Sequence, residues 1–211
     1  TAAVIVETVQ GEAGLIPPNT EWLQALRRRC DDTGALLILD EIQAGMGRTG
    51  RLFAFEGYGI VPDILLLAKG FGGGMPLGAF LARQEVMQTL THDPVLGHIT
   101  TFGGHPVSAA AGLATLEILL EGDLLAQAPA KEALFRKLLV HPAIRDVRSA
   151  GLWLAVDLGD SAKVKQVIGH CMDRGVITDW FLFNDRSLRI APPLIISEEE
   201  IRFACEVILS G

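Results

Sequence analysis

The sequence has little that would indicate a disulfide-rich, metal-binding, membrane or nucleic-acid-binding protein. It contains only 3 cysteines in 211 residues, and they are scattered, so we expect no disulfide framework and a reducing, cytoplasmic location. No H-E-x-x-H motif occurs, and we expect no metal site. No apolar run is long enough to span a membrane, and no signal-peptide pattern opens the chain. The formal net charge of −7 argues against nucleic acid as a main partner.

The phosphate-binding motif of P-loop ATPases is also missing. The run ALLILDE, from Ala35 to Glu41, is similar to the Walker B strand of those enzymes. Such a strand needs G-x-x-x-x-G-K-[ST] upstream, whereas here the glycines follow Lys69. The sequence therefore disfavours a P-loop ATPase.

Two short apolar runs each end in residues that carry charge. Ala35–Leu39 is followed by Asp40 and Glu41, and Ile64–Ala68 is followed by Lys69 and a glycine-rich loop. Continuous apolar runs of this length are typical of strands buried in a parallel sheet, whose ligand site lies at the carboxyl ends of its strands. We therefore expect Asp40 and Lys69 at the same edge of one sheet.

An acid and a lysine at one sheet edge, with glycines beside the lysine, suit a pyridoxal phosphate (PLP) site. A lysine amine forms a Schiff base with the cofactor aldehyde, and a carboxylate keeps the pyridine nitrogen protonated so that the ring accepts electrons. Glycines allow the backbone to approach the cofactor without Cβ clashes. This chemistry assigns the first role to Lys69 and the second to Asp40.

Several segments, in order along nearly the whole chain, resemble the class III aminotransferases. They are LDEIQAGMGRTG (Leu39–Gly50), Pro62-Asp63-Ile64, Ala68-Lys69-Gly70, VETVQGEAG (Val6–Gly14), TTFGGHP (Thr100–Pro106) and RIAPPLIISEEE (Arg189–Glu200). Thr8 and His105 depart from the proline and asparagine usual in the family. The resemblance implies an α/β fold of fold-type I PLP-dependent transferases, with part of the mostly parallel large domain in residues 1–121 and a small α/β C-terminal domain in residues 122–211.

The resemblance also implies that the N-terminal part of the protein precedes Thr1. Full-length relatives carry there a Gly-Thr loop for the cofactor phosphate and an aromatic residue that stacks on the ring. Neither occurs in this chain, which reads as the C-terminal half of an aminotransferase.

Five further residues receive roles from the resemblance. Gln43 would hydrogen-bond the cofactor phenolic oxygen, Thr101 would bind the cofactor phosphate in the partner subunit of a homodimer, and Thr100 would line the site. Arg189 would grip the substrate α-carboxylate in a bidentate pair. Glu12 matches a glutamate that pairs with this arginine when an ω-amine enters and moves away for 2-oxoglutarate.

The implied function is an aminotransferase that passes an ω-amino group, from acetylornithine, ornithine or a similar donor, to 2-oxoglutarate by a ping-pong mechanism. Another class III reaction, such as 4-aminobutyrate transamination, stays open. A truncated, non-catalytic dimerising or binding module is the alternative from a different class. Glu41 is interpreted as a structural residue, because neighbouring side chains of a strand point in opposite directions.

The patterns also predict local structure that bears on these roles. We expect a helix capped by Asn19 or Thr20 whose exposed side carries Arg27–Arg29, and a buried, alanine-rich helix over His105–Leu120. In the second domain, Asp123 is expected to cap a helix, and Ser197 with Glu200 to form a capping box. Short strands are expected over Val176–Thr178 and Ser187–Ile190.

Overall fold

The computed structural model describes residues 1–211 as two compact units. The first comprises Thr1–Thr8, Asn19–Met46 and Phe53–Glu121; the second comprises Val9–Pro18, Gly47–Leu52 and Gly122–Gly211. The division of the chain into domains 1–121 and 122–211 stays a prediction. Glu12, expected in the first domain, is in the second unit. None of the helices is both long and apolar enough to cross a membrane.

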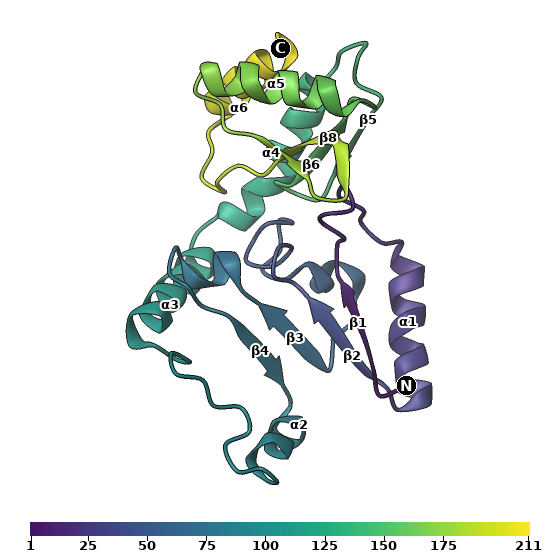
Figure 1. Ribbon diagram of the computed structural model, residues 1–211, viewed down its shortest axis with the longest axis vertical. Coiled ribbons are helices and arrows are strands. Elements are labelled where there is room, and N and C mark those ends of the chain that lie inside the picture. The colour runs from purple at the N-terminus through teal and green to yellow at the C-terminus, as the bar shows by residue number, and fades with distance from the viewer. The chain divides into compact units, whose positions relative to one another are not determined.

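A four-stranded sheet forms the centre of the first unit (Figure 1). Its order is β1 (Ala3–Glu7), β2 (Leu36–Asp40), β3 (Ile64–Leu67) and β4 (Ala79–Ala82). The first three strands run parallel and β4 runs antiparallel to β3. The expected mostly parallel sheet is therefore confirmed.

Helix α1 (Thr20–Thr33) covers one face of this sheet. Asn19 caps it by accepting hydrogen bonds from the N–H groups of Glu21 and Trp22, as expected. The expectation that Arg27 lies on the exposed side is wrong. Its side chain is only 13% exposed and forms a 2.8 Å ion pair with Asp63, because that carboxylate is fixed at the start of β3 by the Leu37 N–H.

The rest of the first unit consists of short helices and helix α3 (Pro106–Glu121). The short ones are η1 (Ala54–Tyr58), η2 (Lys69–Gly72), α2 (Gln84–Gln88) and η3 (Thr89–Thr91). Only Ser108, Gly112 and Leu119 of α3 are buried. The prediction of a buried helix is therefore wrong for this chain, since apolar side chains such as Leu113 and Ile118 are exposed.

The second unit contains an antiparallel sheet of order β5-β6-β8-β7 with three helices (Figure 1). The elements are α4 (Leu124–Leu138), β5 (Asp146–Ser149), β6 (Leu154–Asp157), α5 (Ser161–Asp173), β7 (Asp179–Phe181), β8 (Asn184–Ile190) and α6 (Glu198–Leu209). Its core joins β6 and β8 to all three helices through residues such as Phe135, Val156, Val164, Leu188 and Ile201.

Local predictions for this unit had mixed outcomes. The capping box of Ser197 and Glu200 is confirmed at the start of α6. Asp123 precedes α4 as expected, but its side chain makes no capping hydrogen bond. The strand expected over Val176–Thr178 is wrong, because pairing with β8 begins only at Asp179.

Candidate functional site

Asp40 and Lys69 lie at the carboxyl ends of neighbouring parallel strands. Asp40 is the last residue of β2, and Lys69 follows β3 after one residue. The register pairs Ile38 with Ile64 and Asp40 with Leu66, and neighbouring strands are separated by about 4.8 Å. The structure thus brings together the acid and the lysine that the sequence placed at one sheet edge.

The backbone of Lys69 adopts an unusual conformation. Its φ of 48° is left-handed, whereas Ala68 before it is extended. A left-handed backbone at a residue with a Cβ costs about 1–3 kcal/mol and is often found at functional sites. The conformation turns the chain sharply from β3 into η2 and leaves Lys69 exposed at the sheet edge.

Asp40 is half-buried and its position is set locally. Its Oδ1 accepts a 2.9 Å hydrogen bond from the N–H of Ile42, two residues ahead. This contact holds the carboxylate at the end of the strand and leaves Oδ2 for another donor. A protonated ring nitrogen is one such donor.

Glu41, next to Asp40, is a structural residue, as interpreted from the sequence. It is 1% exposed, and its two carboxylate oxygens accept 2.7 Å hydrogen bonds from the N–H groups of Ala54 and Phe55. Burial raises the pKa of Glu41, against the lowering effect of these hydrogen bonds. The side chain therefore fixes the start of η1 and does not belong to the site.

Replacing Glu41 with alanine is expected to lower the free energy of unfolding by about 2–4 kcal/mol, because two backbone donors lose their acceptor. Since the folded-state pKa of Glu41 is raised, its contribution is fully present below the unfolded-state pKa and is lost as pH rises through the folded-state pKa. Urea unfolding at several pH values measures both effects. Glu117→Ala, at an exposed position of α3, is the control, and equal stability of the two variants would contradict this role.

The glycines after Lys69 serve packing as well as access. Gly73 has a φ of +57°, and a Cβ there would lie 2.7 Å from the carbonyl oxygen of Ala111 in α3. The loop was interpreted as permitting close approach to a cofactor. For Gly73 the structure shows another reason for glycine, namely close contact between η2 and α3.

The remaining predicted residues of the first unit lie in loops. Gln43 is in the turn after β2 and is half-buried, and Thr100 and Thr101 are exposed just before α3. Thr100–Gly104 and Pro76–Gly78 together line a hollow of about 380 Å³. The hydroxyls of Thr100 and Thr101 therefore border an open hollow beside the segment that follows η2.

Arg189 and Glu12 form an ion pair within the second unit. Nη1 of Arg189 lies 3.2 Å from Oε1 of Glu12, although the residues are 177 positions apart. The other oxygen of Glu12, Oε2, accepts a hydrogen bond from the N–H of Leu182 at 2.9 Å. The two residues that the resemblance linked are therefore in direct contact.

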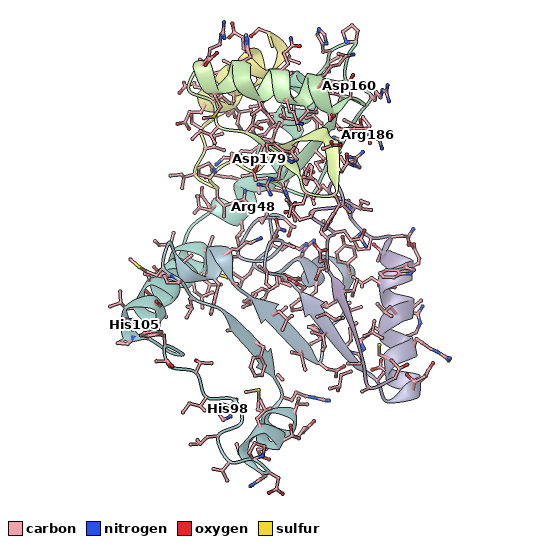
Figure 2. The ribbon with its side chains drawn as sticks, in the orientation of Figure 1. Arg48, His98, His105, Asp160, Asp179 and Arg186 are labelled. Carbon is pink, nitrogen blue, oxygen red and sulfur yellow. The ribbon has the colours of Figure 1, made fainter.

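Arg189 also contacts a second carboxylate, which the sequence did not predict. Oδ2 of Asp179 lies 2.6 Å from Nη2 of Arg189, across the β7–β8 hairpin (Figure 2 labels Asp179). The available signal was an acid and an arginine on either side of a short turn. It was missed because the expected strand stopped at Thr178.

Arg48 is a half-buried cation that contacts two carbonyl groups. Its Nη1 donates to the carbonyl oxygens of Leu152 at 2.8 Å and Pro192 at 2.6 Å (Figure 2 labels Arg48). Burial lowers the pKa of this guanidinium. Arg48 thus ties the segment Gly47–Leu52 to Leu152, which precedes β6, and to the residues that follow Arg189.

No group of three or more His, Cys, Asp or Glu side chains in the structure could hold a metal ion. The predicted site residues of the first unit offer the amine of Lys69, the carboxylate of Asp40, the amide of Gln43 and the hydroxyls of Thr100 and Thr101. The second unit offers one guanidinium between two carboxylates. These groups can bind an organic cofactor and substrate carboxylates.

Comparison with known proteins gives consistent results. The family model described as aminotransferase class-III matches residues 1–210. Ornithine aminotransferase from Toxoplasma gondii, whose structure is described as having partial PLP occupancy at its active site, is 35% identical with a TM-score of 0.90. Ornithine delta-aminotransferase from Plasmodium falciparum is 34% identical with a TM-score of 0.87, and a Bacillus anthracis aminotransferase is 31% identical with a TM-score of 0.90.

These matches cover nearly all of this chain but only part of the other proteins. In each case 99% of this chain is aligned, against 50%, 55% and 51% of the three chains. The chain therefore spans about half the length of the solved structures that it matches.

Proposed function

The chain belongs to the class III aminotransferase family, and on this premise we propose that it forms the catalytic part of a PLP-dependent ω-aminotransferase. The observation that carries the proposal is the placement of Asp40 and Lys69 at the ends of the parallel strands β2 and β3. The donor is an ω-amino compound of the ornithine or acetylornithine class, and the acceptor is 2-oxoglutarate.

The residues at the sheet edge fit PLP. Lys69 is exposed and has a left-handed backbone. The carboxylate of Asp40 is half-buried, and one of its oxygens accepts the N–H of Ile42. When bound, PLP supplies an aldehyde that bonds to amines and a ring that takes up electrons from the substrate carbon. An amine and a carboxylate on neighbouring strands are the two groups that this chemistry requires from the protein.

Each proposed role follows from the side chain's own chemistry. Lys69 holds the cofactor through its amine and, once released, moves a proton to and from the substrate carbon as general base and acid. Asp40 keeps the ring nitrogen protonated through its charge. Gln43 donates to the phenolic oxygen, Thr101 binds the phosphate, and Thr100 lines the site.

The ion pair in the second unit supports the choice of an ω-amino donor. Arg189 left alone would attract the donor's α-carboxylate and bind the donor backwards. Glu12, 3.2 Å away, neutralises the guanidinium during the first half-reaction. For 2-oxoglutarate to reach Arg189 in the second half-reaction, Glu12 has to move away.

Two further proposals concern assembly and compartment. We place the protein in a homodimer in which Thr101 reaches the partner's site. The exposed apolar side chains of Val95, Leu96, Ile99 and Phe102 beside Thr101 support a protein contact there. A reducing cytoplasm fits the three free, buried cysteines.

Single-turnover kinetics test the function directly. We expect the holoenzyme to convert its bound PLP to the amine form with an ω-amino donor, and 2-oxoglutarate to restore the starting absorbance. The two half-reactions are measured separately by stopped-flow absorbance. A holoenzyme without either spectral change would refute the proposed function and favour a non-catalytic module.

In the same experiment, Glu12→Ala is expected to raise the rate with glutamate relative to the ω-amino donor by about 10-fold. This value lies between those of exposed and buried ion pairs, because both side chains are partly exposed. Arg189→Ala should instead slow the 2-oxoglutarate half-reaction most. Glu12→Gln, which can still accept the Leu182 N–H, isolates the effect of charge. An unchanged donor ratio in Glu12→Ala would eliminate the gating role.

A further inference from the structure

Arg189 contacts two carboxylates, although the proposed mechanism uses only one. Glu12 lies at Nη1 and Asp179 at Nη2, at 3.2 and 2.6 Å. We propose that Asp179 is a positioning residue: a fixed second counter-ion that keeps the Arg189 guanidinium aimed when Glu12 moves away. This inference rests on the proposed aminotransferase function and specifies how its acceptor is bound.

Asp179 is held in place by the hairpin itself. It is the register partner of Arg189 between the antiparallel strands β7 and β8, so their Cβ atoms are about 4.5–5.5 Å apart. Its Oδ1 accepts a 2.8 Å hydrogen bond from the Trp180 N–H, which sets the carboxylate orientation. Thr178 adds a hydrogen bond from its hydroxyl to the Arg189 carbonyl at 2.6 Å. The Asp179–Arg189 contact therefore persists as long as the hairpin is formed.

Glu12 occupies a different structural context. It lies between β1 and α1, and its main-chain oxygen accepts a 3.0 Å hydrogen bond from the N–H of Phe183 in the hairpin. Its Oε2 contacts the N–H of Leu182 at the hairpin tip, where Leu182 and Phe183 are 72% and 84% exposed. The Glu12 side chain is 19% exposed, less than the 47% of Asp179, but its 3.2 Å contact with Arg189 is the longer of the two. In the proposed mechanism Glu12 is the carboxylate that moves, and it holds Arg189 through the longer contact.

The charges of Glu12, Arg189 and Asp179 explain how Asp179 affects substrate binding. With both carboxylates in place, the three groups carry a formal charge of −1, and this excess discourages any substrate carboxylate. When Glu12 leaves, Arg189 and Asp179 remain as a neutral pair, and Nη1 becomes available while Nη2 stays fixed. A substrate carboxylate then meets an arginine that is already oriented.

Asp179 also repels an incoming carboxylate, and this repulsion opposes the benefit of holding Arg189 in position. The Asp179 side chain is 47% exposed, so solvent screens its repulsion. The 2.6 Å contact is a short, charge-assisted hydrogen bond that orders a long side chain of high rotamer entropy. Positioning is therefore the larger effect, and Asp179 favours binding of the acceptor.

The variant Asp179→Asn tests this inference in the holoenzyme. Asparagine keeps the size and can accept the Trp180 N–H, but it loses the charge. We expect the KM for 2-oxoglutarate to rise about 10-fold, or about 1.4 kcal/mol, with kcat within about threefold and the donor half-reaction unchanged. The control is Asp185→Asn, the same substitution at an exposed position of β8. An unchanged or lower KM in Asp179→Asn would overturn the proposal.

A second readout does not depend on catalysis. The Nε–Hε signal of Arg189, identified by its loss in Arg189→Lys, reports side-chain order through its ¹⁵N relaxation in the cofactor-free chain. In a Glu12→Ala background, Asp179→Asn should increase the mobility of this group, whereas Asp185→Asn should leave it unchanged. Equal mobility in all three proteins would overturn the positioning role. A wild-type holoenzyme without either half-reaction would refute the proposed function, while the relaxation data would still report on Asp179.

Discussion

Replacing Lys69 with alanine is expected to abolish covalent attachment of PLP and to reduce transamination by at least about 10³-fold. The amine is both the attachment point and the general base, and loss of a general base by itself costs about 10²–10⁴-fold. Alanine keeps the Cβ, so the left-handed backbone at φ 48° is equally strained in both proteins and the fold should persist. Absorbance of the bound cofactor and steady-state rates measure the two effects.

Chemical labelling checks the same residue independently. Borohydride reduction of the holoenzyme followed by peptide mass mapping should place the cofactor on Lys69. Lys163→Ala, which removes an exposed amine from α5, is the matched control and should keep full activity. A label on any other lysine would refute the assignment.

Asp40→Asn is expected to retain bound PLP but to slow proton abstraction from the donor by about 10²–10³-fold, the usual cost of losing one preorganised electrostatic group. The asparagine oxygen can still accept the Ile42 N–H, which wild-type Asp40 accepts at 2.9 Å. The loss should therefore be electronic, because the ring nitrogen has no anionic partner. Stopped-flow absorbance with donor deuterated at the reacting carbon should show a large isotope effect on the slowed step.

The control for Asp40 is Asp32→Asn, the same chemical change on an exposed position of α1. It should leave both half-reactions at wild-type rates. Near wild-type turnover of Asp40→Asn would eliminate the proposed role of the carboxylate.

The sheet edge with Asp40 and Lys69 was predictable because its determinants are local. Each residue follows a short apolar run, and parallel strands place their carboxyl ends at the same edge. The structure gives these runs as β2 and β3, with boundaries shifted by no more than one residue. The capping box at Ser197 was predictable for the same reason, since both of its residues lie within one turn.

Local patterns did not reveal which distant groups would meet. Arg27 looked like part of a solvated arginine run, but Asp63, 36 residues later, draws it into the interface between α1 and the sheet. Gly73 was interpreted as allowing the backbone to approach a cofactor, but the close approach of α3 is what excludes a Cβ there. In both cases tertiary contact outweighs a local preference of small energy.

The residues themselves determined that an acid, an amine and a glycine loop would share one sheet edge, because strand length and direction follow from nearby apolar positions. Only the tertiary structure placed Arg189 between Glu12 and Asp179. That cluster depends on the register of the β7–β8 hairpin and on a contact over 177 residues. A one-residue shift in register would point Asp179 to the opposite face, and no local pattern encodes that choice.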